Sequence, residues 1–463
     1  MSRGVREITQ NGKTPDFKNF GQRCTALSGG NWNNSSQAGI VNVNSNNVSS
    51  KSNCNFRCRV ELRLLFSRMG NLEQHFCPRR KAKHTTWHKI RLVSQEEILD
   101  LVLLFNMKRH GNLFHNINNY GNIELGHQNA KHGKAHYTAV QMVESNRDKY
   151  LRQIQQLLSD KSFTTSDYDV FKIHKPKKRD ISRLPYYPDR IVQYALLNII
   201  APIWDKIFVY DVYSAIPGKG IHKAIDRLKY FLKDKENTQY CLQFDIAKFY
   251  PSVNHEILKQ LIRRKIKCKE TLWLLDDIVD SPSGNTGIPI GNYTSQYFAN
   301  IFLNWLDHWI KQQLKCKYYI RYADDGVILS GSKNHLHNIR QQIGHYLNDN
   351  LALKFNPKTQ IYPVDDRGID FLGYRTFRDY ILLRKKSAKK FRRKLKKIKQ
   401  QRDKISDQHI ISSIMSYVGW VQHCNGYNLI NSFLLEDSEI LDIMDKACNR
   451  LDFDNPLREK YKI

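Results

Sequence analysis

The stretch Tyr322-Ala323-Asp324-Asp325 constrains the fold of this 463-residue chain more than any other, because two adjacent carboxylates stand between two strand-like runs. Residues 318–322 before it and 327–329 after it are rich in aromatic and β-branched residues, which favour β-strands. Asp325-Gly326 supplies a turn dipeptide. The sequence therefore predicts a β-hairpin that carries two carboxylates at its turn.

A third carboxylate, Asp245, follows a predicted buried strand at 240–244, and a helix is expected to begin near Pro251. Three carboxylates at the ends of neighbouring strands can hold two divalent ions about 3.5 to 4 Å apart, which suits phosphoryl transfer. Mg²⁺ prefers such oxygen ligands, and Mn²⁺ is the alternative ion. The competing interpretation is that Asp324 and Asp325 are ordinary turn formers. Two other Asp-Asp pairs, in a helical pattern at 276–277 and in a polar loop at 365–366, lack flanking strands.

The segments around these carboxylates, 244–251 and 322–325, resemble two catalytic motifs of reverse transcriptases. Four further segments resemble motifs of that family in the same order: the triphosphate-gripping fingers segment at 172–193, the template and nucleotide contact motif at 290–296, the next palm motif at 353–359 and the primer grip at 371–374. The resemblance implies an α+β right-hand polymerase with fingers, a palm of antiparallel sheet and helices, and a helical thumb. It also implies an RNA-directed DNA polymerase that acts on template RNA, a primer or cDNA, and dNTPs.

The resemblance assigns roles to single residues. The expected catalytic and metal-binding residues are Asp245, Asp324 and Asp325; the expected dNTP contacts are Lys175, Arg179, Tyr250, Ile290, Gly291 and Lys358; and the expected primer grip is Phe371, Leu372, Gly373 and Tyr374. Arg179 and Lys175 suit a triphosphate, since a guanidinium forks onto phosphate oxygens and an ammonium acts as a point charge. Tyr250 is expected beneath the sugar, with core packing as its alternative. Lys358 resembles a lysine that protonates the leaving pyrophosphate, with a plain surface lysine as its alternative.

One departure from the common pattern points to a subclass. Most family members carry Gln-Gly before a Ser-Pro pair, whereas this chain has Ile290-Gly291 before Ser295-Gln296. That departure is similar to the reverse transcriptases of diversity-generating retroelements, which residues 109–113 and 211–220 also resemble. This subclass implies error-prone copying of template-repeat RNA at adenines, diversification of a target gene, and a small basic accessory protein. The alternatives are another bacterial reverse transcriptase, of the phage-defence, retron or group II intron type, and an inactive RNA-binding module.

Composition agrees with a nucleic-acid enzyme. Lys and Arg outnumber Asp and Glu by 74 to 44, a formal charge of +30, so phosphate backbones should be attracted with marked salt dependence. Nine irregularly spaced cysteines fit a reducing compartment better than a disulfide scaffold. No apolar run approaches the roughly 18 residues of a membrane span. We therefore expect no membrane association and a cytoplasmic location in a bacterial or phage-infected cell.

The chain is expected to have four parts. Residues 1–68 form an Asn- and Ser-rich, low-complexity extension. Its segment 29–57, with nine Asn between residues 31 and 55, resembles the variable segment of a C-type-lectin-like target protein. We interpret this extension as the template repeat translated in frame with the polymerase gene. The alternative is a disordered tail of unrelated origin. Residues 69–107 form a basic extension with an amphipathic helix, 108–383 the fingers and palm, including a helix at 139–158, and 384–463 a basic helical thumb.

The segment 384–404 holds thirteen Lys or Arg and one Asp, with Phe391, Leu395 and Ile398 at helical spacing. Such a run is usually a solvated face, but its place after the primer grip favours contact with the template–primer duplex. The expected contacts are Lys385, Lys386, Lys389, Lys390, Arg392, Arg393, Lys396 and Lys397. Tyr417, Trp420 and Tyr427 are predicted to be thumb core rather than base-stacking platforms.

Overall fold

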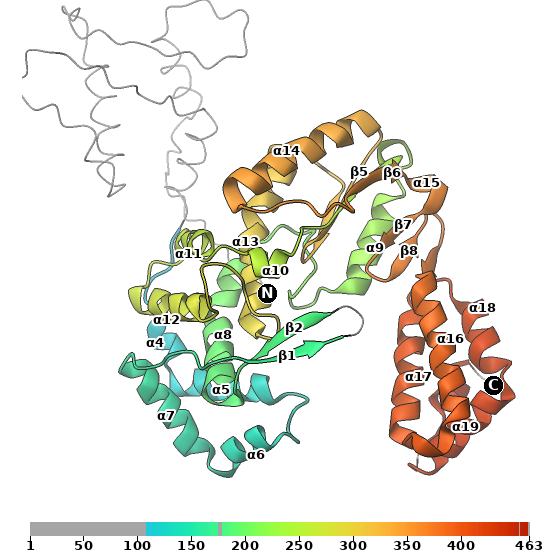
Figure 1. Cartoon of the computed structure of the whole chain (residues 1–463), viewed down its shortest axis with the longest axis horizontal. Coiled ribbons are helices and arrows are strands. Elements are labelled where there is room, and N and C mark those ends of the chain that lie inside the picture. The colour runs from blue at the N-terminus through green and yellow to red at the C-terminus, as the bar shows by residue number, and fades with distance from the viewer. Residues whose placement is uncertain (1–107, 175–177, 453, 462–463) are drawn as a thin grey trace, which may run out of the picture. The chain divides into compact units, whose positions relative to one another are not determined.

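The computed structural model describes residues 108–174, 178–452 and 454–461, which all lie within one unit of the chain, 107–463. The fold is a mixed one of helices and antiparallel sheets (Figure 1). The predictions for residues 1–68 and 69–107, and the predicted triphosphate contact Lys175, lie outside the described residues.

Helices and one hairpin form the first part of the described chain. They are α4 (Phe114–Ile117), α5 (Tyr120–Lys131), α6 (Thr138–Ser145), α7 (Arg147–Ser159), the strands β1 (Asp169–Ile173) and β2 (Arg179–Arg183), a π-helical turn η2 (Tyr186–Arg190) and α8 (Ile191–Asp205). The single helix predicted at 139–158 is wrong, because Asn146 leaves helical geometry with φ −145° and ψ 58° and separates α6 from α7. Gly126 of α5 lets that helix lie directly against α8, since a Cβ there would stand 2.9 Å from the Ala195 nitrogen.

A four-stranded antiparallel sheet lies at the centre. Its strands are β3 (Tyr240–Phe244), β4 (Tyr319–Tyr322), β5 (Asp325–Ser330) and β6 (Gln360–Pro363), in the order β4-β5-β3-β6. Successive strand residues point to opposite sides of the sheet, and apolar residues stand at both kinds of position. Leu242 and Ile328 belong to one hydrophobic core, and their neighbours Cys241 and Val327 belong to a second one. The sheet is therefore buried on both faces.

Further helices surround this sheet, and three of them, α9 (Ile221–Phe231), α13 (Tyr293–Gln312) and α14 (Lys333–Leu351), contribute to the cores on its faces. The other elements are the 3₁₀ turn η3 (Glu236–Thr238), α10 (Phe249–Ser252), α11 (His255–Arg263) and α12 (Lys269–Asp280). The cores place α13 and α14 on the Leu242 face and α9 on the Cys241 face (Figure 1). The helix expected near Pro251 is two helices, and Asn254 caps the second by accepting a hydrogen bond from the Ile257 N–H.

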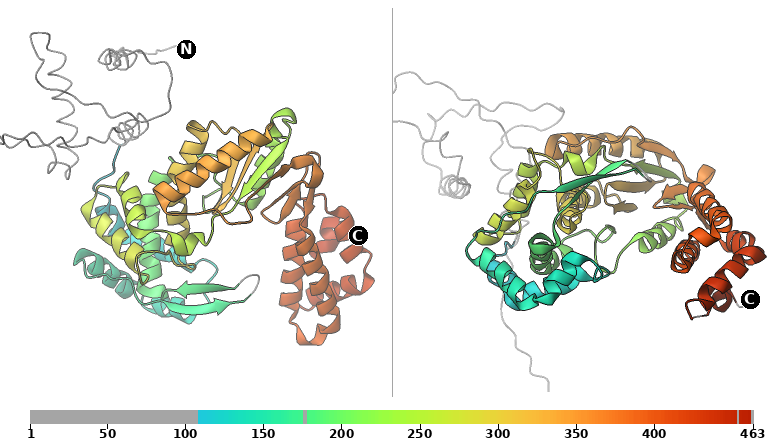
Figure 2. Two further views of the ribbon diagram at one scale, coloured as in Figure 1. Left: turned by 45° about the horizontal axis from the view of Figure 1, so that its top comes forward. Right: turned by 60° about the horizontal axis from the view of Figure 1, so that its bottom comes forward.

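The last part of the chain carries a small sheet and a group of helices (Figure 2). After α15 (Val364–Arg367) come the strands β7 (Ile369–Phe371), β8 (Tyr374–Thr376) and β9 (Ile381–Leu383), then α16 (Lys385–Gln400), η4 (Arg402–Lys404), α17 (Asp407–Val421), α18 (Tyr427–Ile430), η5 (Asn431–Leu435), α19 (Ser438–Asn449) and α20 (Pro456–Tyr461). No helix in the described ranges is long and apolar enough to cross a membrane.

The predicted apolar stripe of the basic helix is confirmed, since Phe391, Leu395 and Ile398 of α16 are buried. Tyr417 stacks on Phe391 with ring centroids 4.4 Å apart, which makes it part of this core as predicted. The same prediction is wrong for Tyr427, whose side chain is 66% exposed at the start of α18.

Candidate active site

The hairpin predicted around the two adjacent carboxylates is present, but its turn lies two residues earlier than expected. Tyr322 pairs with Asp325, so Ala323 and Asp324 form the turn, and Ala323 adopts a left-handed φ of 54°. Gly326 is already inside β5, opposite Phe244 of β3. A Cβ at Gly326 would lie 2.2 Å from the Phe244 ring. Glycine is thus required there for close packing between strands and not for the turn.

The hairpin brings Asp324 close to Asp245, which directly follows β3. Burial, and then the negative charge of Asp245, raise the pKa of Asp324 to about 6, and the Arg179 guanidinium offsets part of this rise in pKa. The two carboxyl groups also lie within hydrogen-bonding reach of each other. Two carboxylates held this close repel each other unless a proton or a cation lies between them.

Asn356 fixes the position of Asp245. Its side-chain amide donates a hydrogen bond of 2.8 Å to Oδ2 of Asp245, and its backbone N–H donates one of 2.7 Å to the Asp245 carbonyl. The Ala247 N–H donates in turn to the Lys354 carbonyl at 2.9 Å. The segment 353–359 thereby holds the end of β3. Lys358, the predicted proton donor in this segment, is exposed, and its role stays a prediction.

Asp325 is the third predicted ligand. It is exposed at the first position of β5, one residue beyond the turn that carries Asp324. In the described part of the chain, no group of three or more His, Cys, Asp or Glu side chains is arranged to hold a metal ion. The structure thus brings two of the three predicted carboxylates together, and the role of Asp325 stays a prediction. Two oxygen ligands still fit Mg²⁺, which proteins often bind through one or two carboxylates together with substrate phosphates.

A buried ion pair supports the turn from behind. Arg321, the last but one residue of β4, donates through Nε and Nη2 to the two Asp307 carboxylate oxygens of α13, at 2.7 and 2.5 Å, and both side chains are 0% exposed. The Tyr319 hydroxyl donates to the same carboxylate at 2.6 Å. Nη1 of Arg321 donates to the Ala323 carbonyl at 2.7 Å, so the pair holds the turn that presents Asp324.

Sequence reasoning gave no role to Arg321, Asp307 or Asn356. Arg321 could have been noticed as a cation inside an otherwise apolar strand. A charge buried there needs a partner of opposite charge. The partner, Asp307, is fourteen residues away on a helix, and no spacing rule singles it out. Asn356 lies inside a segment that was predicted as a motif, but its contact with Asp245 depends on the fold.

The hairpin β1–β2 is fastened to the segment that contains Ile290 and Gly291. The Ser182 N–H of β2 donates to the Ile290 carbonyl at 2.9 Å. A Cβ at Gly291, whose φ is 133°, would lie 2.4 Å from the Ser182 carbonyl oxygen. Only glycine permits this approach. Arg179 begins β2 and carries an exposed guanidinium that acts electrostatically on Asp324.

Tyr250 lies beside the carboxylate pair. Burial, and then the charge of Asp324, raise the pKa of its hydroxyl, so the ring is near the turn. Tyr250 is also partly buried against the core, with its ring centroid 5.6 Å from that of the buried Phe249, so the core-packing alternative fits the structure as well. The placement of Tyr250 suits its predicted contact with the sugar, and that contact stays a prediction.

The predicted primer grip divides into a buried part and a turn. Phe371 and Tyr374 are core residues of β7 and β8, and the Tyr374 hydroxyl donates to the Trp420 carbonyl at 2.9 Å. Leu372 and Gly373 form the turn, with φ of 50° and 92°. A Cβ at Gly373 would lie 2.8 Å from the Trp420 ring of α17. Trp420 therefore joins this turn to the C-terminal helices.

The other two Asp-Asp pairs have structural partners, as their surroundings suggested. Asp276 of α12 forms an ion pair with Arg263, and Asp277 accepts hydrogen bonds from the backbone and hydroxyl of Thr165. The pair 365–366 lies in α15 rather than in a loop, where Asp365 binds Arg378. These contacts place neither pair in the site.

Carboxylates paired at the ends of antiparallel strands, with an arginine close by, define a site suited to metal-assisted phosphoryl transfer. Residues 173–376 match the family model described as reverse transcriptase (RNA-dependent DNA polymerase). This part of the chain is therefore similar in sequence to the polymerase domain of reverse transcriptases.

Three curated proteins are similar to part of this chain. Protein YkfC of Escherichia coli is 28% identical over 253 residues, which cover 45% of this chain and 66% of that protein. The putative COX1/OXI3 intron 2 protein of Saccharomyces cerevisiae is 24% identical over 40% of this chain and 29% of its own length. The group II intron-encoded protein LtrA of Lactococcus lactis is 20% identical over 44% of this chain and 45% of its own length. The chain thus spans less than two thirds of each of these relatives.

Among solved structures, apo telomerase from Candida tropicalis aligns with 62% of this chain and 58% of its own, at 12% identity and a TM-score of 0.37.

Proposed function

We propose that this protein is an RNA-directed DNA polymerase whose palm is the β4-β5-β3-β6 sheet. The observation that carries the proposal is the close pair Asp245 and Asp324, inside the region that matches reverse transcriptases. An inactive RNA-binding module would not need two mutually repelling carboxylates at a partly buried turn, since burying such a pair costs stability. This argues against the inactive alternative.

In this proposal Asp245 and Asp324 bind Mg²⁺, with Asp325 as a further ligand, and Mn²⁺ as the alternative ion. The metal supplies activation of the primer 3′-oxygen and charge stabilisation on the triphosphate. Asn356 keeps the Asp245 carboxylate in one orientation, and Arg321 does the same for the turn that carries Asp324. Arg179 binds the triphosphate and Tyr250 lies beneath the sugar. The substrates are template RNA, a primer or growing cDNA, and dNTPs.

We further propose that the polymerase belongs to a diversity-generating retroelement and copies its template RNA with errors at adenines. Ile290 supports this, because it replaces a glutamine that can hydrogen-bond near the nascent base pair, while its carbonyl keeps the contact with β2. A small basic accessory protein is the expected partner. The similarity to LtrA, a group II intron-encoded protein, favours the alternative, a bacterial reverse transcriptase of another type.

Primer extension on RNA with dNTPs and Mg²⁺ tests the polymerase proposal. Asp324→Asn and Asp325→Asn each remove a charge with little change of shape, so synthesis should fall by orders of magnitude while RNA binding changes little. The matched control is Asp366→Asn, which alters an exposed Asp-Asp pair in α15. Full activity in both site variants would refute the assignment.

The subclass has a separate test. A template repeat and a variable repeat beside the gene, differing mainly at adenines, would support the retroelement proposal. A genomic neighbourhood without such a pair would refute it and leave the polymerase proposal intact.

A further inference from the structure

Helix α16 carries cations on two separate flanks. Ten of its sixteen residues are Lys or Arg and none is acidic. Residues three or four positions apart share a helix face. By this spacing Lys389, Arg392, Lys396 and Lys399 form one flank, which we call the groove flank. Lys386, Lys390 and Lys397 form the other, the open flank.

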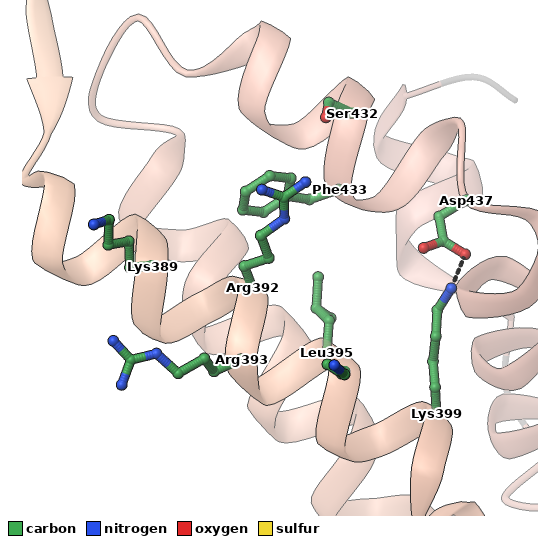
Figure 3. Close-up of a pocket in the computed structure, with 9 residues that line it drawn as sticks. Lys389, Arg392, Arg393, Leu395, Lys399, Ser432, Phe433 and Asp437 are labelled. Carbon is green, nitrogen blue, oxygen red and sulfur yellow. Dashed lines mark hydrogen bonds and ion pairs between the residues drawn. The ribbon is translucent and has the colours of Figure 1, made fainter.

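The groove flank lines a cavity of about 480 Å³ against the following helices. Its lining residues are Lys389, Arg392, Arg393, Leu395, Lys396, Lys399, Ser432, Phe433 and Asp437 (Figure 3). Within the described ranges, Lys399 is the one cation of this cavity that has acidic partners, Asp437 at 2.6 Å and Glu439 at 2.9 Å. The other four cations leave the cavity strongly positive.

The cavity also offers an aromatic surface. Arg392 lies over the half-buried Phe433 ring, 5.4 Å from its centroid, and the two side chains point toward each other (Figure 3). Phe433, which also contacts Phe391 with ring centroids 5.8 Å apart, holds the Arg392 guanidinium in place. A base can stack on the outer side of this guanidinium, and phosphates can bind the neighbouring lysines. The exposed hydroxyl of Ser432 adds a hydrogen-bonding group at the rim.

The volume of the cavity indicates which ligand the groove flank can bind. A cavity of about 480 Å³ is in the range of small-ligand sites. It has room for one or two nucleotides but not for a duplex, in which bases are paired and cannot reach the Arg392 guanidinium. Lys386, Lys390 and Lys397 of the open flank are exposed, so they are free to follow a duplex surface.

We propose that the groove flank binds an unpaired segment of the template RNA, outside the hybrid duplex that the open flank contacts. The proposal rests on the polymerase function proposed above and refines the role of the eight residues of α16 that were predicted to contact the duplex. Three of those residues, Lys389, Arg392 and Lys396, then bind single-stranded RNA rather than the duplex.

The test compares two triple variants that each remove three positive charges from the same helix. The groove variant is Lys389→Gln/Arg392→Gln/Lys396→Gln, and the control is Lys386→Gln/Lys390→Gln/Lys397→Gln. Lys399 stays unchanged because it holds Asp437, which caps α19. The full-length protein is titrated by fluorescence anisotropy with an unstructured RNA oligonucleotide and with a blunt RNA–DNA duplex, over a series of salt concentrations.

The groove variant should lose about tenfold more affinity for the unstructured RNA than for the duplex, and the control variant should show the opposite bias. The slope of log affinity against log salt for the unstructured RNA should fall by about 2, because each lost contact with a single strand contributes about 0.7. Equal losses for both ligands in both variants would overturn the proposal and leave a general cationic surface.

A third variant, Phe433→Leu, tests the stacking surface without changing charge. The affinity for unstructured RNA should fall about tenfold with an unchanged salt slope, since base stacking is worth about 1 to 3 kcal/mol. An unchanged affinity would refute the base-binding role. None of these titrations contains dNTPs or metal, so primer extension by the unaltered protein reports separately on whether the polymerase proposal itself fails.

Discussion

The ion pair between Arg321 and Asp307 gives the sharpest prediction. Asp307→Asn keeps the shape of the side chain but leaves the Arg321 guanidinium charged and without its counter-ion at 0% exposure. Removing one partner of a buried pair costs about 3 to 5 kcal/mol, because the other charge stays buried. The free energy of unfolding should fall by that amount. Polymerisation should also slow by about a hundredfold, since displacement of a catalytic group by about 1 Å has effects of this size.

A surface pair provides the matched control. Arg263 and Asp276 also form two hydrogen bonds, but their side chains are 39% and 30% exposed, so solvent screens the pair. Asp276→Asn should cost about 0 to 1 kcal/mol and leave polymerisation unchanged. Urea unfolding followed by tryptophan fluorescence measures the first quantity, and single-turnover primer extension measures the second. Equal unfolding free energies for the two variants would show that Arg321 is not desolvated and would refute the reasoning.

A triple variant separates stability from positioning. Arg321→Met/Asp307→Leu/Tyr319→Phe replaces the buried polar cluster by apolar side chains of similar volume, and such replacements are often neutral or stabilising. Stability should recover, whereas the Ala323 carbonyl would still lack its donor and polymerisation should remain slow. Polymerisation at the unaltered rate in this variant would mean that the turn needs no support from Arg321.

Three further predictions concern the nucleotide site. Tyr250→Ala should raise ribonucleotide incorporation relative to deoxynucleotide in competition assays, and an unchanged preference would make Tyr250 a core residue. Ile290→Gln should lower misincorporation at template adenines by several-fold, since one hydrogen bond of about 0.5 to 1.5 kcal/mol changes discrimination roughly two- to tenfold; sequenced cDNA with an identical error spectrum would contradict this. Gly291→Ala should raise the KM for dNTPs because its Cβ would meet the Ser182 carbonyl at 2.4 Å, whereas Gly419→Ala, with no atom within 4 Å, should leave KM unchanged.

Much of the fold around the site could be predicted because the relevant patterns are local. The strand 240–244 is mostly apolar, with Gln243 as its one polar residue, and the predicted strand matches β3 at both ends. The apolar spacing of Phe391, Leu395 and Ile398 likewise predicted the buried face of α16. The break at Asn146 was missed, since the apolar pattern continues across α6 and α7 and only the backbone angles show the interruption.

The residues that support the site were harder to predict, because their contacts join distant parts of the chain. Asn356 is 111 residues from Asp245. The position of the hairpin turn was missed for a different reason. Asp-Gly is a strong turn signal, but Gly326 is needed for the Phe244 ring, and Ala323 takes the left-handed conformation instead. A packing requirement between strands therefore displaced the local turn preference.

The attachment of β2 to residues 290 and 291 has a consequence for how such an enzyme evolves. In the proposed function, nucleotide affinity and copying accuracy depend on one backbone contact, so a substitution that relaxes accuracy at residue 290 or 291 should also shift β2, which carries Arg179. We therefore expect substitutions at residues 290 and 291 that change copying accuracy to change the KM for dNTPs as well.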